Sequence, residues 1–375
     1  MQKLYDTIII GAGIAGSTAA FMLQRAGERV ILLDRSRVPA SGGSGAAGAF
    51  VSPKIGKGGP LQQLTNEAFA FAHTFYREHT PEHFTASGVV RIPKNPDDAE
   101  RFSLYEPHNY PVYERWSRED LAARGIADAW GGFYFPEAGD CDAPAVCRTL
   151  ASGIDFVQLD VRRLSRAGDV WRIEGVDRTL EAARVVLATG YQNELIDMRY
   201  MGIRGLWGSR GDYGTSTTLP VSLHKSLSVS STRQGRVKIG ATHVKHTDPC
   251  LACNGQPLAD IFDGASELVD TSDFTLLETF CGMRSTSRDH VPVVGEVIDV
   301  SRMLQECPAI VRGATAPLQH IANLFVLNGL GGRGFVFAPL MAQWLTARIV
   351  SGCPIPDRVH PDRLFYKWAR TYLTK

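Results

Sequence analysis

Two arginines lie in segments of small residues in the last third of the chain. Arg333 lies in NGLGGRGFVFAP, residues 328–339, just before an apolar run that predicts a helix over residues 335–350. Arg284 lies in CGMRSTSRDHVPVVG, residues 281–295. A cation near a helix N-terminus stabilises negative charge, and the planar fork of an arginine matches a carboxylate. Both are candidate catalytic residues, unless Arg333 merely caps a surface helix and Arg284 forms a salt bridge to Asp289.

Such residues need a scaffold, and the first 35 residues predict one. An apolar strand, a glycine turn, an amphipathic helix and a second strand are expected at residues 5–10, 11–13, 14–26 and 30–33. Gly11, Gly13 and Gly16 have the G-x-G-x-x-G spacing, which lets backbone amides and a helix N-terminus approach a pyrophosphate. Asp34 ends the second strand, where a carboxylate accepts hydrogen bonds from a ribose. The alternative is a glycine turn that only packs a helix on a sheet.

The rest of the chain predicts an α/β (α+β) protein of two domains. Gly-rich sequence follows Asp34, a helix is expected over residues 61–78, and an apolar strand over residues 184–188 ends at Thr189 and Gly190. We expect a Rossmann-like nucleotide-binding domain from residues 1–86, 140–198 and 281–375. We expect a second, mostly antiparallel β-sheet domain for the substrate from residues 87–139 and 199–280.

Composition excludes several classes of protein. The 375 residues are 44% apolar and 21% charged, which is typical of a globular chain. No stretch approaches the roughly 20 apolar residues of a membrane span, so a soluble, cytoplasmic protein is expected. The seven cysteines are an odd number at irregular spacings, which argues against a complete disulfide framework. Cys250 and Cys253 have the spacing of half a zinc site, but no second pair follows, and we predict no metal.

The formal charge of +1 is unevenly distributed. Residues 199–245 contain eight lysines and arginines against Asp212 alone, a local charge of +7. Such a stretch is typical of a surface that meets a polyanion. It is equally typical of an exposed sheet edge protected by basic side chains.

The motifs together resemble a known family. The order GAGIAG, LATG, IGAT, CGMRSTSRDHVPVVG and FVLNGLGGRG is similar to that of the FAD-dependent D-amino-acid oxidase and glycine oxidase (DAO) family. Within it, ASGGSGAAGAF, CGMRSTSRDHVPVVG and CPIPDRVHPDRLF look most like the oxidoreductase domain of the MnmC family, which modifies tRNA. The resemblance covers nearly the whole chain.

The resemblance implies an amine oxidoreductase with FAD across the first domain. Arg284 matches the family arginine that binds the substrate carboxylate, although serine follows it where proline is common, and Arg333 matches an arginine near the flavin. The residues expected at the cofactor are Gly11, Gly13, Ile14, Ala15, Gly16, Asp34, Arg35, Ser41, Ala47, Thr189, Gly190, Gly329, Gly331, Gly332, Arg333 and Gly334. His290, His320 and Tyr213 are further candidates without a spacing argument.

The implied substrate is 5-carboxymethylaminomethyl-uridine at the tRNA wobble position, oxidised to aminomethyl-uridine and glyoxylate. The expected partner is therefore tRNA, bound through residues 199–245. The nucleotide-binding strand begins at residue 5, so no methyltransferase domain is expected ahead of it, and methylation would need a separate methyltransferase. Two alternatives stay open: an oxidase of free glycine-like or sarcosine-like amines, and a non-catalytic flavoprotein or tRNA-binding module.

Overall fold

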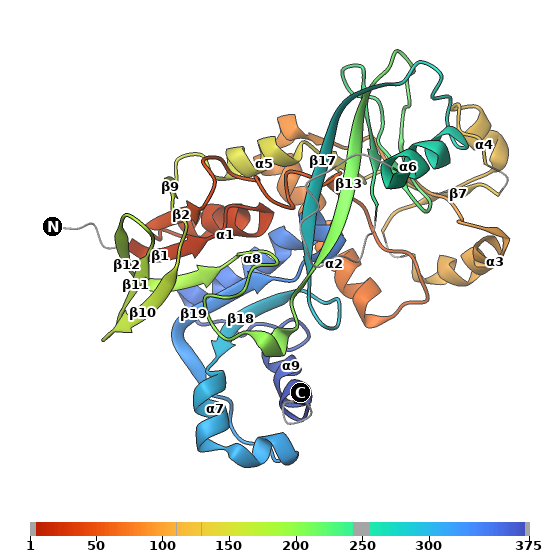
Figure 1. Ribbon diagram of the computed structural model, residues 1–375. Coiled ribbons are helices and arrows are strands. Elements are labelled where there is room, and N and C mark those ends of the chain that lie inside the picture. Colours follow the sequence, from red (N-terminus) through yellow and green to blue (C-terminus); the bar gives the residue numbers. More distant parts are fainter. Residues whose placement is uncertain (1–4, 110, 129, 243–255, 372–375) are drawn as a thin grey trace.

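The computed structural model describes residues 5–109, 111–128, 130–242 and 256–371. Within them, two large sheets and one small sheet are covered by helices (Figure 1). The α/β fold class is confirmed. The described helices are α1 (Ile14–Arg25), α2 (Pro60–His79), α3 (Pro96–Tyr105), α4 (Arg118–Ala122), α5 (Ala143–Leu150), α6 (Gln256–Ser266), α7 (Val300–Glu306), α8 (Gly334–Ser351) and α9 (Asp362–Ala369).

The first sheet is mainly parallel and carries the glycine turn. Its strands run in the order β10 (Arg163–Ala167), β11 (Val170–Glu174), β12 (Thr179–Leu187), β1 (Tyr5–Ile10), β2 (Val30–Asp34) and β9 (Asp155–Gln158), while β19 (His320–Asn328) pairs with β12 and β18 (Val293–Ile298). Strands β9, β2, β1, β12 and β19 are parallel to one another, whereas β11 pairs antiparallel with β12 and β18 with β19. Buried apolar side chains alternate between two clusters, one on each face of β1 and β2, so helices cover the sheet on both faces.

The second sheet is mainly antiparallel. Its order is β17 (Thr275–Thr286), β13 (Arg204–Gly214), β16 (Arg236–Gly240), β15 (Ser228–Val229), β14 (Ser222–His224), β5 (Val89–Arg91), β7 (Gly132–Phe135) and β6 (Glu114–Trp116). Strands β13 and β17 form a long antiparallel ribbon that Figure 1 shows running between the two parts of the molecule. The small sheet contains β3 (Phe50–Val51), β8 (Gly139–Cys141) and β4 (Phe84–Thr85).

The local predictions agree with these elements. Strand β1, helix α1 and strand β2 have the expected order, and α2 and α8 lie within two residues of their expected limits. The strands of both large sheets fall inside the ranges expected for the two domains, except that β17 crosses the expected boundary at residue 281. The division into a cofactor domain and a substrate domain stays a prediction. Among the described helices, none has both the length and the apolar character needed to cross a membrane.

Candidate functional site

A cavity of about 950 Å³ is lined by residues of both large sheets. The carboxyl ends of β1 and β2 and the start of α1 form one end. Residues of β5, β13, β14, β17 and the segment before α8 form the other end. Ligands of open α/β sheets bind beyond the carboxyl ends of the parallel strands, and this cavity has that position.

At the first end, the start of α1 lies in the cavity wall. No side chain caps α1, and its first turn contains no acidic residue. The Ile14 amide donates to the Ser44 hydroxyl at 2.9 Å. Asp34 accepts hydrogen bonds from the amides of Ala12 (2.8 Å) and Ser36 (2.9 Å), so its carboxylate holds the turn as well as facing the cavity. A helix N-terminus whose first turn contains no acidic residue suits a diphosphate.

Two glycines show why the turn has its spacing. Gly11 has φ +106°, and a β-carbon there would lie 2.3 Å from the Ala188 carbonyl oxygen at the end of β12. A β-carbon at Gly16 would lie 1.8 Å from the Gly11 carbonyl oxygen. Gly16 therefore lets α1 pack against the turn, and it lies outside the cavity lining. Gly329 also lies outside the lining, where a β-carbon would meet Ser287 at 3.1 Å.

The cavity brings together the other residues that the sequence singled out. Those in its lining are Gly11, Gly13, Ile14, Ala15, Asp34, Arg35, Ser41, Ala47, Thr189, Gly190, Arg284, Gly331, Gly332, Arg333 and Gly334. Their direct contact with a cofactor or substrate stays a prediction.

Arg284 lies on β17 as a half-buried cation. Its Nη1 donates to two backbone carbonyls, of Thr242 at 3.1 Å and Trp207 at 3.4 Å. A β-carbon at Gly208 would lie 2.3 Å from the guanidinium, so that glycine makes room for the side chain. Asp289, the acid that could have neutralised Arg284, pairs with Arg363 at 2.8 Å instead. Within the described residues Arg284 has no carboxylate partner, and burial lowers its pKa.

Arg333 precedes the first residue of α8 and is also half-buried. Its Nη1 donates to the Ser52 carbonyl at 3.0 Å. Burial lowers the pKa of Arg333 to about 10, so it stays charged at neutral pH. Its position in the cavity wall differs from that of an exposed helix cap, and it gives the site a second cation beside a helix N-terminus.

Sequence reasoning missed several residues of the site. Ser44 meets the start of α1, and Asn328 joins three segments: its Nδ2 donates to the Gly190 carbonyl (2.7 Å), and its Oδ1 accepts from Ser285 (2.7 Å) and the Gly329 amide (2.8 Å). Lys54, Arg91 and His224 also line the cavity. The position of Asn328 at the end of an apolar strand was a usable signal for it. The other residues come from segments of mixed composition that had no comparable pattern.

The three candidates without a spacing argument have different positions. His290 lines the cavity as an exposed residue. Tyr213 is buried on β13 against Phe262 and Phe274, away from the cavity lining. His320 forms an ion pair with Asp362 near the C-terminal end of the described chain.

A group of possible metal ligands was not foreseen. His320, His360 and Asp362 bring ligand atoms within 4.8 Å of one another. Hydrogen bonds among these side chains account for their proximity. Cys250 and Cys253 lie outside the described residues. Among the described cysteines, Cys281 is disulfide-bonded, and the free thiols are Cys141, Cys147, Cys307 and Cys353.

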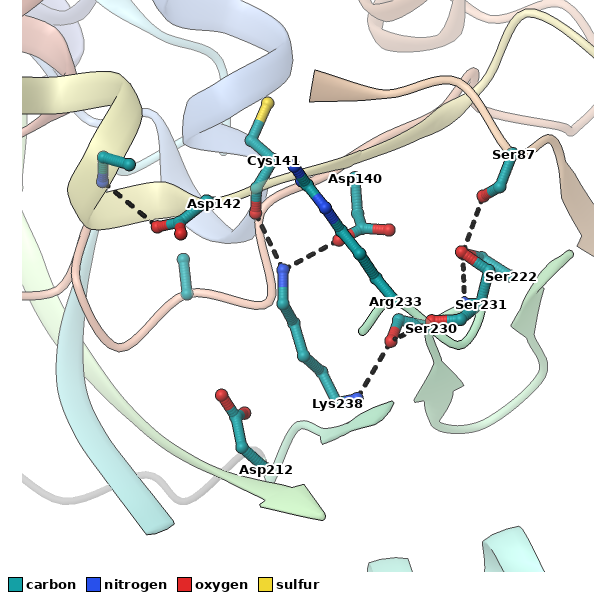
Figure 2. Close-up of polar contacts among 12 residues, drawn as sticks. Ser87, Asp140, Cys141, Asp142, Asp212, Ser222, Ser230, Ser231, Arg233 and Lys238 are labelled. Atoms are coloured by element: carbon teal, nitrogen blue, oxygen red, sulfur yellow. Dashed lines mark hydrogen bonds and ion pairs between the residues drawn. The ribbon is translucent and has the colours of Figure 1, made fainter. Parts of the chain in front are cut away.

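The basic stretch is not a continuous free surface. Four of its cations pair with carboxylates: Arg199 with Asp197 (2.7 Å) and Arg210 with Asp212 (2.7 Å), both close in sequence, and Lys225 with Asp128 (3.2 Å) and Lys238 with Asp140 (2.7 Å), both in a distant segment. Figure 2 shows Lys238 directed at Asp140 and the Cys141 carbonyl. Arg233 donates to the Glu82 carbonyl, and Lys245 lies outside the described residues. These contacts reduce the free charge of residues 199–245, whereas Arg204 and Arg236 are exposed, and the binding of a polyanion by this stretch stays a prediction.

Comparison with known proteins agrees with this site. The family model described as FAD dependent oxidoreductase (DAO) matches residues 6–348. The chain belongs to this family. FAD is therefore its cofactor, and the prediction of an FAD-dependent oxidoreductase is confirmed. The bare start of α1, the glycine turn and the small residues of the cavity wall fit such a dinucleotide.

The similar proteins differ in length. The tRNA 5-methylaminomethyl-2-thiouridine biosynthesis bifunctional protein MnmC of Pseudomonas putida strain F1 is 27% identical over 96% of this chain and 59% of its own length. The MnmC of Caulobacter sp. strain K31 is 30% identical over 93% of this chain and 55% of its length. The chain thus spans less than two thirds of these relatives. The crystal structure of glycine oxidase from Bacillus cereus matches with a TM-score of 0.79 at 21% identity, covering 93% of this chain and 96% of that one.

Proposed function

We propose that this chain oxidises the carboxymethyl arm of 5-carboxymethylaminomethyl-uridine at the wobble position of tRNA. The products are aminomethyl-uridine and glyoxylate. The observation that carries the proposal is Arg284: it is half-buried in the wall of the cavity, and no described carboxylate neutralises it. The arm of the proposed substrate is an N-substituted glycine, whose carboxylate matches that cation.

The chain's own part in the reaction is to bind and orient. Bound FAD supplies an acceptor for two electrons. Arg284 holds the carboxylate, and so positions the carbon between the carboxylate and the neutral amine. That carbon gives up a hydrogen with its bonding electrons, and the nitrogen lone pair completes a carbon–nitrogen double bond. Water then adds to this bond, which breaks to give glyoxylate and the primary amine. A neutral amine needs no dedicated base, and we assign none.

The MnmC relatives support a tRNA substrate. Their names place them in the biosynthesis of a modified uridine of tRNA and call them bifunctional. The present chain spans 59% of the first of them, so only part of their chemistry belongs to the proposal. A methylation that follows the oxidation would be the work of another catalytic unit. We place the reaction in the cytoplasm, where tRNA is modified.

A second candidate function is the oxidation of a free glycine-like or sarcosine-like amine. The observation that favours it is the pairing of Arg210, Lys225 and Lys238 with carboxylates, which reduces the free positive charge that would supply sequence-independent affinity for tRNA. The same role of Arg284 applies to this substrate.

The experiment that separates the two is anaerobic bleaching of the flavin. The purified yellow protein is mixed with tRNA that carries 5-carboxymethylaminomethyl-uridine, and separately with glycine and with sarcosine. We expect the modified tRNA to bleach the flavin and release glyoxylate, whereas tRNA without the modification leaves it oxidised. Bleaching by the small amines alone would replace the proposal with the second candidate. No bleaching by any of them would contradict both.

A further inference from the structure

Arg91 and His224 face the cavity from neighbouring strands. Parallel pairing of β5 with β14 sets Arg91 opposite His224, and the Ile92 amide donates to the His224 carbonyl at 2.9 Å. The preceding residues, Val90 and Leu223, pack into the core of the second sheet. Side chains alternate between the faces of a strand, so Arg91 and His224 project to the opposite face and line the cavity.

The segment after β3 brings Lys54 to the same wall. The Phe50 ring packs edge-on against the His224 ring, with 4.7 Å between their centroids. The Ser52 carbonyl accepts the hydrogen bond from Arg333. The Lys54 amide donates to Asn66 Oδ1 at 2.8 Å, which fixes the backbone while the lysine side chain lines the cavity. Lys54, Arg91 and Arg333 therefore belong to one wall.

This wall carries positive charge without a counter-ion. No carboxylate of the described chain forms an ion pair with Lys54, Arg91 or Arg333. Burial and the nearby Arg333 lower the pKa of Arg91 to about 9, although Asp98, which forms no ion pair with it, acts in the opposite direction. Burial, Arg333 and Arg91 lower the pKa of Lys54 as well. Neighbouring cations repel one another, and burial disfavours their charge. A bound anion would remove both effects.

His224 adds a neutral donor. Burial, Arg91 and Arg333 lower its pKa well below the usual value, so the ring is neutral at pH 7. Its Nδ1 lies 3.1 Å from the Ser228 hydroxyl. If Nδ1 accepts that hydroxyl proton, the ring's own proton is on Nε2. Nε2 is buried and has no hydrogen-bond partner within the described structure. An acceptor oxygen of a ligand would satisfy it.

We propose that Lys54, Arg91 and His224 form a second anion-binding subsite, which takes a phosphate or carboxylate group of the substrate other than the carboxylate at Arg284. This inference rests on the proposed function, because it assumes that the first carboxylate lies at Arg284. In the tRNA substrate the second anion is a phosphate next to the modified nucleoside. In a small amine it is a second carboxylate. The arginine fork binds either group in two charge-assisted hydrogen bonds.

The test uses the FAD-loaded protein and two pairs of ligands that differ by one anionic group. The first pair is 5-carboxymethylaminomethyl-uridine and its 5′-monophosphate, and the second is sarcosine and iminodiacetate. Anaerobic rapid mixing gives the dissociation constant separately from the rate of flavin reduction. Calorimetry with inorganic phosphate adds a measurement without turnover. We expect Arg91→Met to weaken the binding of inorganic phosphate and of the pair member with the additional anionic group by roughly tenfold or more, and the binding of the other member far less.

Several variants control for folding. Lys54→Met should also weaken the binding of the ligand with the additional anionic group, and it replaces Arg91→Met in the test if that variant does not fold. Arg91→Lys should recover part of the affinity because it keeps the charge. Arg115→Met removes an exposed cation of the same sheet and should change the affinity for neither member of a pair.

The outcomes assign the ligand or overturn the subsite. If the variants lose affinity selectively for the 5′-monophosphate, the group bound at the subsite is a phosphate. If they lose affinity selectively for iminodiacetate, it is a carboxylate. Equal weakening of both members, or no change in either pair, overturns the proposal. Failure of the proposed function is a different result: the unaltered protein's flavin would then stay oxidised with both uridine compounds and with modified tRNA, while phosphate calorimetry would still report on the subsite.

Discussion

Two groups of half-buried charges in this protein are built in opposite ways. The cavity wall contains Lys54, Arg91, Arg284 and Arg333, none of which has an acidic partner among the described residues. Near the C-terminus, the acidic and basic side chains of a second group contact one another; we call this group, Glu296, His320, Arg348, His360 and Asp362, the C-terminal cluster. We infer that the unpaired charges bind a ligand, whereas the paired charges stabilise the fold.

The C-terminal cluster joins elements that are far apart in sequence. Glu296 of β18 accepts from Arg348 of α8 at 2.6 Å and from His360 at 3.0 Å. Asp362, the first residue of α9, contacts His320 of β19 (2.9 Å) and His360 (3.2 Å). The cluster thus ties α8 and α9 to the edge of the first sheet. If the comparison is correct, substitutions in the cavity wall reduce activity and those in the C-terminal cluster reduce stability.

The largest expected effect belongs to Arg284→Ala. Because the arginine would pair with a desolvated carboxylate, its loss should cost about 3 to 5 kcal/mol of transition-state binding. This equals a fall in kcat/KM of roughly a hundredfold to a few thousandfold. The FAD content and the unfolding temperature should stay close to those of the unaltered protein. A folded, FAD-loaded variant with unchanged turnover would rule out the role of Arg284.

Glu296→Gln should give the opposite signature. It leaves Arg348 and His360 without their shared carboxylate, and we expect a loss of about 2 kcal/mol in the free energy of unfolding. Glu306→Gln is the matched control, because the Glu306–Arg302 pair is about half exposed and should contribute less than about 1 kcal/mol. Denaturant unfolding of the FAD-loaded proteins measures both. Equal losses in the two variants would contradict a special role for the C-terminal cluster.

The same cluster predicts how stability depends on pH. Burial alone would lower the pKa of His360, but its hydrogen bonds to Asp362 and Glu296 outweigh this and raise the pKa to about 9. A raised pKa stabilises the fold fully below about pH 6.5, and this contribution is lost as the pH rises toward 9. Burial would raise the pKa of Glu296, yet hydrogen bonds from His360 and Arg348 lower it to about 2. That contribution is present above about pH 4.5 and is lost on acidification.

The measurement is the free energy of unfolding between pH 5 and pH 9, for the unaltered protein and for His360→Gln. We expect the unaltered protein to lose on the order of 1 to 2 kcal/mol more than the variant between pH 6.5 and pH 9. Parallel pH profiles for the two proteins would show that His360 does not carry this dependence.

The sequence predicted what local pattern controls. The glycine turn, α1 and β2 follow from neighbouring residues, since Gly16 allows a close contact within the turn and Gly11 allows one with the end of the adjoining strand. Arg284 and Arg333 were found because each lies in a motif of small residues. Both arginines line one cavity, because the two motifs meet at the ends of the sheets.

The sequence could not predict contacts that depend on long-range pairing. Arg91 and His224 are brought together by two short strands more than 100 residues apart, in segments without periodic pattern. The free charge of the basic stretch could not be predicted for the same reason. Asp128 and Asp140, which neutralise Lys225 and Lys238, come from a distant segment, so counting charges along residues 199–245 overstated the free charge. Charge pairing is a property of the fold, which a local count cannot include.

The smallest expected effect tests that correction. Arg236 is exposed and forms no ion pair with a described residue, so Arg236→Gln should change the free energy of unfolding by less than about 0.5 kcal/mol. Lys238→Gln on the same strand should cost more, because it strips the buried Asp140 of its partner. If modified tRNA is the substrate and Arg236 contacts a phosphate, its loss should reduce the salt dependence of tRNA affinity by about one unit of slope, whereas Lys238→Gln should leave that slope unchanged. A reduced salt dependence of tRNA affinity for Lys238→Gln, with unaltered stability, would mean that Lys238 leaves Asp140 to contact the tRNA. Lys238 would then belong with the ligand-binding charges and not with the structural ones.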